Sequence, residues 1–161
     1  MKRFSTSRHV AHGASDMFAL VADVERYPEF VPLCQGLRIR KRQPIGIKRS
    51  DGGEDRTGEL LIADMTVAYK VLRETFTSEV RLDPEGNRID VRYIDGPFQS
   101  LNNVWRFMPQ AAGGSVVDFS IAYAFRSRTF QVVAGAVFDR AFQRFAEAFE
   151  ARADRIYGRA A

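Results

Sequence analysis

Three polar residues stand among apolar ones in segments whose alternation is typical of β-strands. Between residues 72 and 82, Glu74 and Ser78 share a face with apolar side chains, and Asn103 does the same between residues 101 and 107. A carboxylate on an apolar face must be hydrogen-bonded, paired or neutralised. Glu74 is therefore either a structural group bound to a backbone amide or an arginine, or a group that meets a ligand or a proton.

The residues that most often act as nucleophiles or bases form no catalytic set. His9 is predicted on the polar side of a strand and His12 in a turn, so both are expected at the surface. Cys34, the single cysteine, follows a proline-rich segment without a basic neighbour, which predicts a buried, inert thiol. The sequence has no HExxH, GxSxG or glycine-rich phosphate loop. We expect a binding protein with no catalytic residue and no metal site.

The charge balance is basic, with a net charge of +4 and a pI near 9.5. Its densest basic run comprises Arg38, Arg40, Lys41, Arg42, Lys48 and Arg49. Such a run is either a solvated face or a surface for phosphate groups of RNA or anionic lipid. Proteins that bind single-stranded nucleic acid need aromatic residues among the basic ones, and this run has none. We expect no DNA partner.

The last part of the chain predicts one long amphipathic helix over residues 127–157. Apolar residues recur there at steps of three and four, no proline interrupts them, Ser127 or Thr129 is placed to cap the start, and Gly158 follows the end. A helix of about thirty residues is roughly 45 Å long and needs a large partner surface. Phenylalanines on its apolar face are expected in the core.

The preceding residues alternate as strands, which indicates an α+β structure. The pattern predicts an edge strand over residues 3–9, two short helical segments, a rigid corner over 27–34, and an exposed, mobile connection over 43–56. Further strands are expected over residues 37–42, 89–94, 101–108 and 117–126, with two more between 57 and 82 that reverse near 67–70. The prediction is one curved antiparallel sheet of about six or seven strands wrapped around the last helix.

Length and composition predict one domain over residues 1–161, with 45% apolar residues and a proper core. The N-terminal segment lacks the apolar run of a signal peptide or membrane span. We therefore expect a soluble cytoplasmic protein, with peripheral contact to an anionic inner-membrane surface as an open alternative.

Four motifs in order carry a resemblance to a known family. They are Tyr27-Pro28-Glu29-Phe30-Val31-Pro32 with Cys34; Glu74-x-Phe76-Thr77-Ser78; Asp95-Gly96-Pro97-Phe98 with Leu101, Trp105 and Phe107; and a final helix with Gly135 and Phe138. With these, nearly the whole chain resembles the START-like coenzyme Q-binding family. That family includes RatA-like ribosome association toxins and belongs to the polyketide cyclase and lipid transport superfamily of helix-grip folds. Two residues depart from the family pattern. Leu33 stands where an aromatic residue is expected, and Glu79 stands where a basic residue is usual.

The resemblance implies a cavity between sheet and helix that holds a polyprenyl quinone, such as ubiquinone, or a similar lipid in support of respiration. The residues expected to bind this ligand are Phe30, Leu33, Glu74, Phe76, Ser78, Tyr93, Phe98, Asn103, Trp105, Phe119, Val137 and Phe138. Its mouth is expected where the corner over 27–34 meets the loop 95–98 near the start of the last helix. The alternative is a toxin that binds the large ribosomal subunit through the basic run, and a third possibility is a cyclase or aromatase.

Overall fold

The computed structural model describes residues 1–49 and 51–158, and within them seven strands form one antiparallel sheet. The strands are β1 (Lys2–Val10), β2 (Cys34–Ile47), β3 (Arg56–Tyr69), β4 (Leu72–Asp83), β5 (Arg88–Asp95), β6 (Phe98–Pro109) and β7 (Ser115–Phe125). Their order across the sheet is β1-β7-β6-β5-β4-β3-β2, so β1 and β2 are the edge strands. The predicted sheet and the edge position of the first strand are confirmed.

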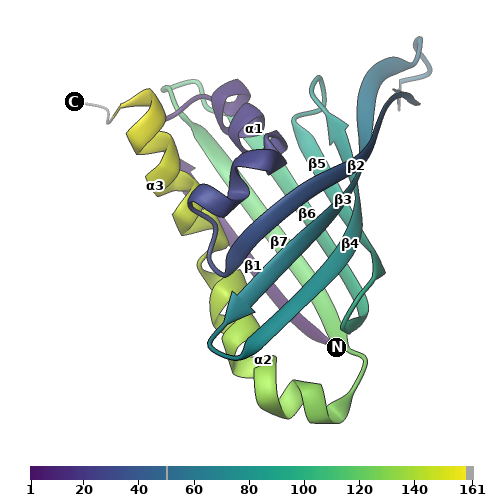
Figure 1. Cartoon of the computed structure of the whole chain (residues 1–161). Helices are drawn as coiled ribbons and strands as arrows, with labels where there is room; N and C mark the ends of the chain where they lie inside the picture. Colours follow the sequence, from purple (N-terminus) through teal and green to yellow (C-terminus); the bar gives the residue numbers. More distant parts are fainter. Residues whose placement is uncertain (50, 159–161) are drawn as a thin grey trace.

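Two helical segments follow β1, and two helices end the described chain. They are α1 (Ala14–Ala22), the 3-10 helix η1 (Val24–Glu29), α2 (Arg128–Gln143) and α3 (Phe145–Tyr157). In Figure 1 the strands curve past α2 and α3, which run along one side of the sheet, while α1 and η1 lie near the upper end of α3. This arrangement confirms the predicted α+β, helix-grip architecture.

The prediction of one unbroken final helix is wrong at Arg144. The start and end behave as expected, because the Ser127 hydroxyl accepts a hydrogen bond from the Phe130 amide and Gly158 has a φ of 84°. At Arg144, however, the backbone N–H reaches the carbonyl of Ala141, three residues back, over 3.1 Å. No proline or glycine marks this tight turn. The break lets phenylalanines on both helices stay against a sheet that curves.

The segment predicted as a mobile connection over residues 43–56 is mostly strand. β2 continues to Ile47 and β3 begins at Arg56, so the connection between them is shorter than predicted. Pro44 is tolerated because β2 is an edge strand and its missing N–H interrupts no inner ladder. The reversal between β3 and β4 lies at Lys70 and Val71, close to the predicted position.

Aromatic side chains fill the space between the concave face of the sheet and the two final helices. The ring of Phe98 lies 5.3 Å from that of Phe138 and 5.7 Å from that of Phe76, and Trp105 lies 5.0 Å from Phe149. Phe98, Phe138 and Phe149 are fully buried. The phenylalanine spacing of the final helices therefore serves the core, as predicted.

His12 is not the surface residue that its place in a turn predicted. Its side chain is buried, and its Nε2 lies 2.7 Å from Oδ1 of Asp154 on α3. The ring also packs 5.9 Å from that of Tyr157. These contacts join the turn after β1 to the end of α3, a pairing across 142 residues that sequence spacing does not reveal.

An ion pair at the end of β4 contributes to stability in a pH-dependent way. Arg56 donates hydrogen bonds of 2.9 and 2.7 Å to the carboxylate of Asp83, and the Gly86 amide donates a third. Burial acts to raise the pKa of Asp83, but these hydrogen bonds and the nearby arginines outweigh it and hold the pKa below its ordinary value. The stabilisation is therefore complete above the ordinary pKa of an aspartate and is lost as the pH falls through the lower folded value.

We expect Asp83→Asn to lower the free energy of unfolding by about 1.5 to 3 kcal/mol at neutral pH, because a charged partner of Arg56 is lost. The difference from the wild type should shrink as the solution is acidified through the folded pKa of Asp83. Urea unfolding across a pH series measures both effects. Asp51→Asn is the control, since its pair with Arg49 is exposed; an equal loss there would contradict the assignment.

Candidate ligand-binding site

An interior cavity of about 80 Å³ lies between the concave face of the sheet and the helices α2 and α3. Its walls come from every strand except β1, together with η1 and the phenylalanines on both sides of the break at Arg144. The lining residues are Val24, Tyr27, Leu37, Ala63, Met65, Phe76, Ser78, Val80, Ile89, Val91, Leu101, Asn103, Trp105, Ile121, Phe142, Phe145 and Phe149. Almost all of this surface is apolar, which favours a hydrophobic ligand.

Ser78 on β4 and Asn103 on β6 bring polar side-chain atoms to the cavity from either side of β5. The Asn103 amide nitrogen donates a 2.9 Å hydrogen bond to the carbonyl oxygen of Ser120, so its own side-chain oxygen is left to accept from a ligand. Tyr27 is the titratable residue in the lining, and its hydroxyl donates to the carbonyl of Val21 over 2.5 Å. Burial raises the pKa of that phenol, so Tyr27 stays protonated and is not a general base.

Four of the residues predicted to bind the ligand line this cavity, namely Phe76, Ser78, Asn103 and Trp105. Phe98, Phe119 and Phe138 lie instead in the packed core outside its lining, each at 1% exposure or less. Tyr93 is half-buried and accepts a 3.1 Å hydrogen bond from the Phe98 amide. The strand alternation identified the correct face of the sheet, but it did not distinguish the wall of a cavity from the core beside it.

Three other predicted ligand residues lie outside the cavity. Leu33 and Val137 line a separate depression on the surface, between the corner after η1 and the outer side of α2. Phe30 is half-buried against Phe149 at 5.0 Å, and the guanidinium of Arg152 lies 5.0 Å from the centre of its ring. The sequence places these residues near the last helix without revealing on which side of it they lie.

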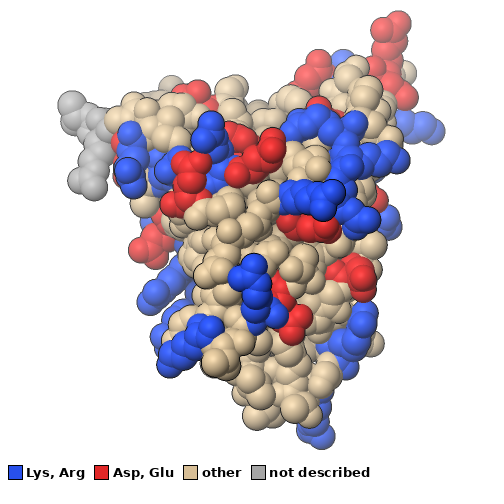
Figure 2. Space-filling view, in the orientation of Figure 1, with Lys and Arg blue, Asp and Glu red and all other residues tan. Residues whose placement is uncertain are grey.

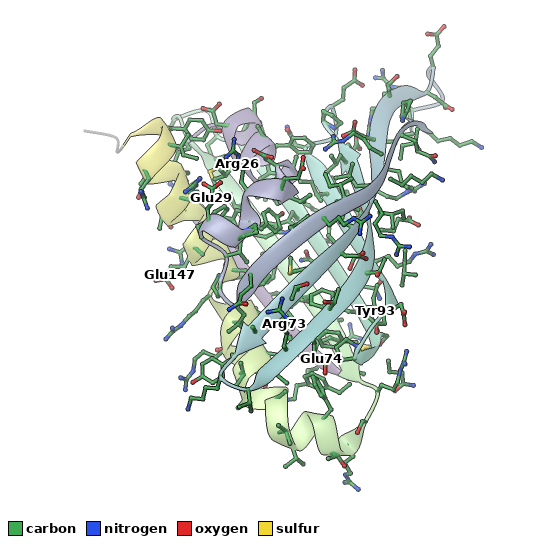
Figure 3. The ribbon with its side chains drawn as sticks, in the orientation of Figure 1. Arg26, Glu29, Arg73, Glu74, Tyr93 and Glu147 are labelled. Carbon is green, nitrogen blue, oxygen red and sulfur yellow. The ribbon has the colours of Figure 1, made fainter. Side chains whose placement is uncertain are left out.

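Glu74 is oriented inward, as predicted, but it does not line the cavity. It pairs in the ladder with the buried Val67 and is half-buried near the start of β4, at the level of α2 in Figure 3. Among the described residues, no hydrogen bond or ion pair of its carboxylate is found. Of the two alternatives for Glu74, the structural bond to an amide or an arginine is therefore not found among the described residues, and a catalytic role in this cavity has no geometric support.

The predicted mouth of the cavity stays a prediction. The corner leads into the start of β2, and the antiparallel strand order places this start at the same end of the sheet as the loop between β5 and β6. The corner over residues 27–34 packs on α3, where Arg152 pairs with Glu29 at 2.5 Å. The loop over 95–98 instead packs at the start of α2, where the amide of Arg126 donates to the carbonyl of Pro97. In Figure 3, Glu29 of the corner and Tyr93 beside the loop lie on different sides and at different heights of the domain.

The basic run does not form one continuous face. A bulge at Arg40 in β2 shifts the register, so that Lys41 lies opposite Ile62 and Arg42 opposite the buried Leu61. Arg40, Arg42 and Arg49 are paired with Asp64, Glu59 and Asp51. Arg38, Lys41 and Lys48 are exposed. Figure 2 shows Lys and Arg side chains gathered over the upper part of β2, with acidic residues among them.

Two further predictions concern the single cysteine and a metal site. Cys34 is buried, as predicted, and burial raises the pKa of its thiol to about 11, which disfavours the thiolate at neutral pH. Within the described part of the chain, no group of three His, Cys, Asp or Glu residues is placed to hold a metal ion. In the same residues, no helix combines the length and the apolar character needed to cross a membrane.

Sequence reasoning missed most of the cavity wall. Leu37 and Met65 on β2 and β3, and Phe142, Phe145 and Phe149 on the helices, belong to it. The spacing of the three phenylalanines predicts ordinary core packing, and the strand pattern gives Leu37 and Met65 no further role. Only the register of the sheet and the break at Arg144 decide which of these side chains border empty space.

Comparison with known proteins finds sequence matches that cover most of the chain. Residues 10–150 match the family described as polyketide cyclase / dehydrase and lipid transport. The chain is 31% identical over 158 residues to the ribosome association toxin RatA of Vibrio cholerae, covering 98% of this chain and 99% of that protein. It is 29% identical over 160 residues to the mitochondrial coenzyme Q-binding protein COQ10 homolog B of Xenopus laevis, covering 97% of this chain and 59% of the frog protein.

A solved structure extends the similarity of fold. The Zhui aromatase/cyclase of Streptomyces superposes with a TM-score of 0.75 at 18% identity, with 99% of both chains covered. At this identity the match shows a shared fold. Together with the sequence matches it confirms the resemblance found in the four motifs, and the chain belongs to the START-like polyketide cyclase / dehydrase and lipid transport family.

Proposed function

We propose that this protein binds a polyprenyl quinone such as ubiquinone, or a similar lipid, in the cavity between sheet and helices and thereby supports respiratory quinone function. The observation that carries the proposal is an almost wholly apolar cavity between sheet and helices with two polar side chains, Ser78 and Asn103, on its wall. A quinone ring has carbonyl acceptors for the Ser78 hydroxyl, and its prenyl chain is matched by the aromatic and aliphatic lining. The name of the frog relative supports the same ligand class.

The cavity must widen to hold such a molecule. At about 80 Å³ it has room for a few water molecules, whereas ligand pockets usually measure about 300 to 1,000 Å³. The lining residues Leu37, Met65 and Phe145 are only half-buried, so the wall is thinnest between the edge strand β2 with its neighbour β3 and the start of α3. Entry of a prenyl chain on this side requires α3 to move away from the sheet, with the turn at Arg144 as its hinge.

Native mass spectrometry tests the proposal on protein purified from a host that makes ubiquinone. We expect a bound species that, after extraction into organic solvent, has the mass and redox spectrum of a prenyl quinone. Refolded protein, stripped of lipid and titrated with ubiquinone, serves as the control for carry-over from the host membrane. Recovery of lipid-free protein that also fails to take up added ubiquinone would exclude the quinone assignment.

A second candidate is a ribosome-associated inhibitor of translation. It is favoured by the similarity to the toxin of Vibrio cholerae over nearly the whole chain, and by the exposed basic side chains of Arg38, Lys41 and Lys48. Three of the six bases in that run are already paired with acids, which weakens the case for a phosphate-binding surface. Catalysis, the third possibility, lacks a titratable group free to act in the cavity lining, because Tyr27 is held protonated by burial.

A further inference from the structure

An uncovered apolar surface lies at the end of the molecule where the β3–β4 turn meets α2. The outward side of α2 carries Val132 and Val133, which are 82% and 68% exposed, and Val71 at the tip of the turn is fully exposed. Val132 and Val133 lie four residues before Ala136 and Val137, so all four share one face of the helix. Isolated exposed valines are common, but Val71, Val132 and Val133 lie on two elements that meet at one end of the molecule.

The turn and the helix are neighbours in space. Tyr69, Val137 and Arg140 line the same surface depression of about 300 Å³, together with Leu33 of the corner after η1. Figure 1 shows the β3–β4 turn beside α2 at the lower end of the domain. Val71 therefore extends beside a helix face that is itself apolar, and we define Tyr69, Val71, Val132, Val133 and Val137 as the terminal apolar patch.

Basic residues border the terminal apolar patch. The charged residues in the lining of the depression are Arg140 and Arg144, and Lys70 lies at the tip of the turn with its ammonium 5.4 Å from the centre of the Tyr69 ring. The nearest acid on α2, Asp139, is engaged by Lys2 at 2.5 Å and by the hydroxyl of Tyr123. In Figure 2 the lower end is largely uncharged, with Lys and Arg prominent around it.

We propose that the terminal apolar patch is a docking surface for a bilayer that contains anionic lipids. The patch combines apolar side chains on a helix face and a turn with a tyrosine and bordering Lys and Arg residues. This combination matches the boundary between the acyl chains and the headgroups of a bilayer. The bases then meet lipid phosphates, and the valines enter the acyl region. This surface is separate from the cavity and from the basic run Arg38 to Arg49, which lies on β2 and directly after it.

A bilayer fits the terminal apolar patch better than RNA does. Binding to a phosphate backbone depends on Lys and Arg side chains and gains nothing from exposed aliphatic ones. Val71 and Val132, by contrast, have almost their whole surface available for burial in lipid. Docking here also places the protein where a prenyl quinone is dissolved. Membrane docking rests on the proposed lipid-binding function. Because docking is measured on vesicles without quinone, its failure is distinguishable from failure of quinone binding in the cavity.

Vesicle flotation of the 161-residue chain tests the docking surface. We expect binding to vesicles of phosphatidylcholine with phosphatidylglycerol, weaker binding without phosphatidylglycerol, and a decline with rising salt. Val71→Glu and Val132→Glu should each lower the partition coefficient about tenfold, because burial of a valine is lost. Lys70→Ala and Arg140→Ala should each lower it about fivefold. All four side chains are exposed, so the fold is expected to survive.

Ile156→Glu is the matched control, because Ile156 is a half-exposed aliphatic residue on α3, away from the terminal apolar patch. It should bind vesicles like the wild type. An environment-sensitive fluorophore on Val71→Cys, in a Cys34→Ser background, should shift to the blue on anionic vesicles, and the same label on Ile156→Cys should not. Equal flotation of wild type, Val71→Glu and Val132→Glu overturns the proposal. The proposal is also overturned if the wild type does not bind vesicles and these variants lose binding to the ribosomal subunit.

Discussion

Replacing Phe142 by alanine is expected to lower the free energy of unfolding by about 3 to 5 kcal/mol. The Phe142 side chain is 4% exposed, and its ring lies 4.8 Å from that of Tyr123 and 5.5 Å from that of Phe145. It joins the core around Phe98 to the wall of the cavity, so its removal both abolishes these contacts and enlarges a space that is already empty. Denaturant unfolding followed by Trp105 fluorescence measures the loss.

Val132→Ala provides the comparison on the same pair of helices, because Val132 is largely exposed. Its substitution should change the free energy of unfolding by less than about 0.5 kcal/mol. A loss below about 1 kcal/mol for Phe142→Ala would mean that the helix does not pack on the sheet as described. The helix-grip architecture would then need revision.

The second large effect is the loss of quinone binding when the cavity is filled. Ala63 lines the cavity from β3 and is 5% exposed. In Ala63→Leu the added carbon atoms occupy part of the 80 Å³ space, so we expect quinone affinity to fall at least about tenfold while stability is kept or raised. Titration with a short-chain ubiquinone analogue measures affinity, and thermal unfolding measures stability.

Ala124→Leu is the control for the added volume, since Ala124 is a half-buried alanine on β7 that does not line the cavity. Ala63 is a better target than Val137 or Phe138, because neither of those residues borders the cavity. If Ala63→Leu unfolds, Ser78→Val tests the same wall with a smaller change. Normal quinone affinity in folded Ala63→Leu would place the ligand elsewhere.

The triple substitution Arg40→Ala, Lys41→Ala and Arg42→Ala separates quinone binding from ribosome binding. It leaves the cavity lining unchanged and removes up to three phosphate contacts, which should flatten the salt dependence of any RNA association. We expect quinone binding and respiration to be kept by this variant and lost in Ala63→Leu. Loss of translation inhibition in the triple variant, with respiration indifferent to Ala63→Leu, would make ribosome association the better function.

Periodicity in the sequence was sufficient for the architecture. Alternation along the strands and the spacing of phenylalanines between residues 130 and 149 follow from which side of each element must be apolar, and that requirement is local. The same reasoning predicted the caps at Ser127 and Gly158, and the buried thiol of Cys34. It also placed Ser78 and Asn103 on the inner face, where they line the cavity.

Only the tertiary structure decided which inward residues border empty space and which are packed. Phe138 and Phe142 lie one helical turn apart on one apolar stripe, yet only Phe142 reaches the cavity. The break at Arg144 and the bulge at Arg40 carry no proline or glycine, because they result from fitting straight elements to a curved sheet. The sequence by itself determined a hydrophobic space between sheet and helix; its walls and its thin side depend on contacts between residues far apart in the chain.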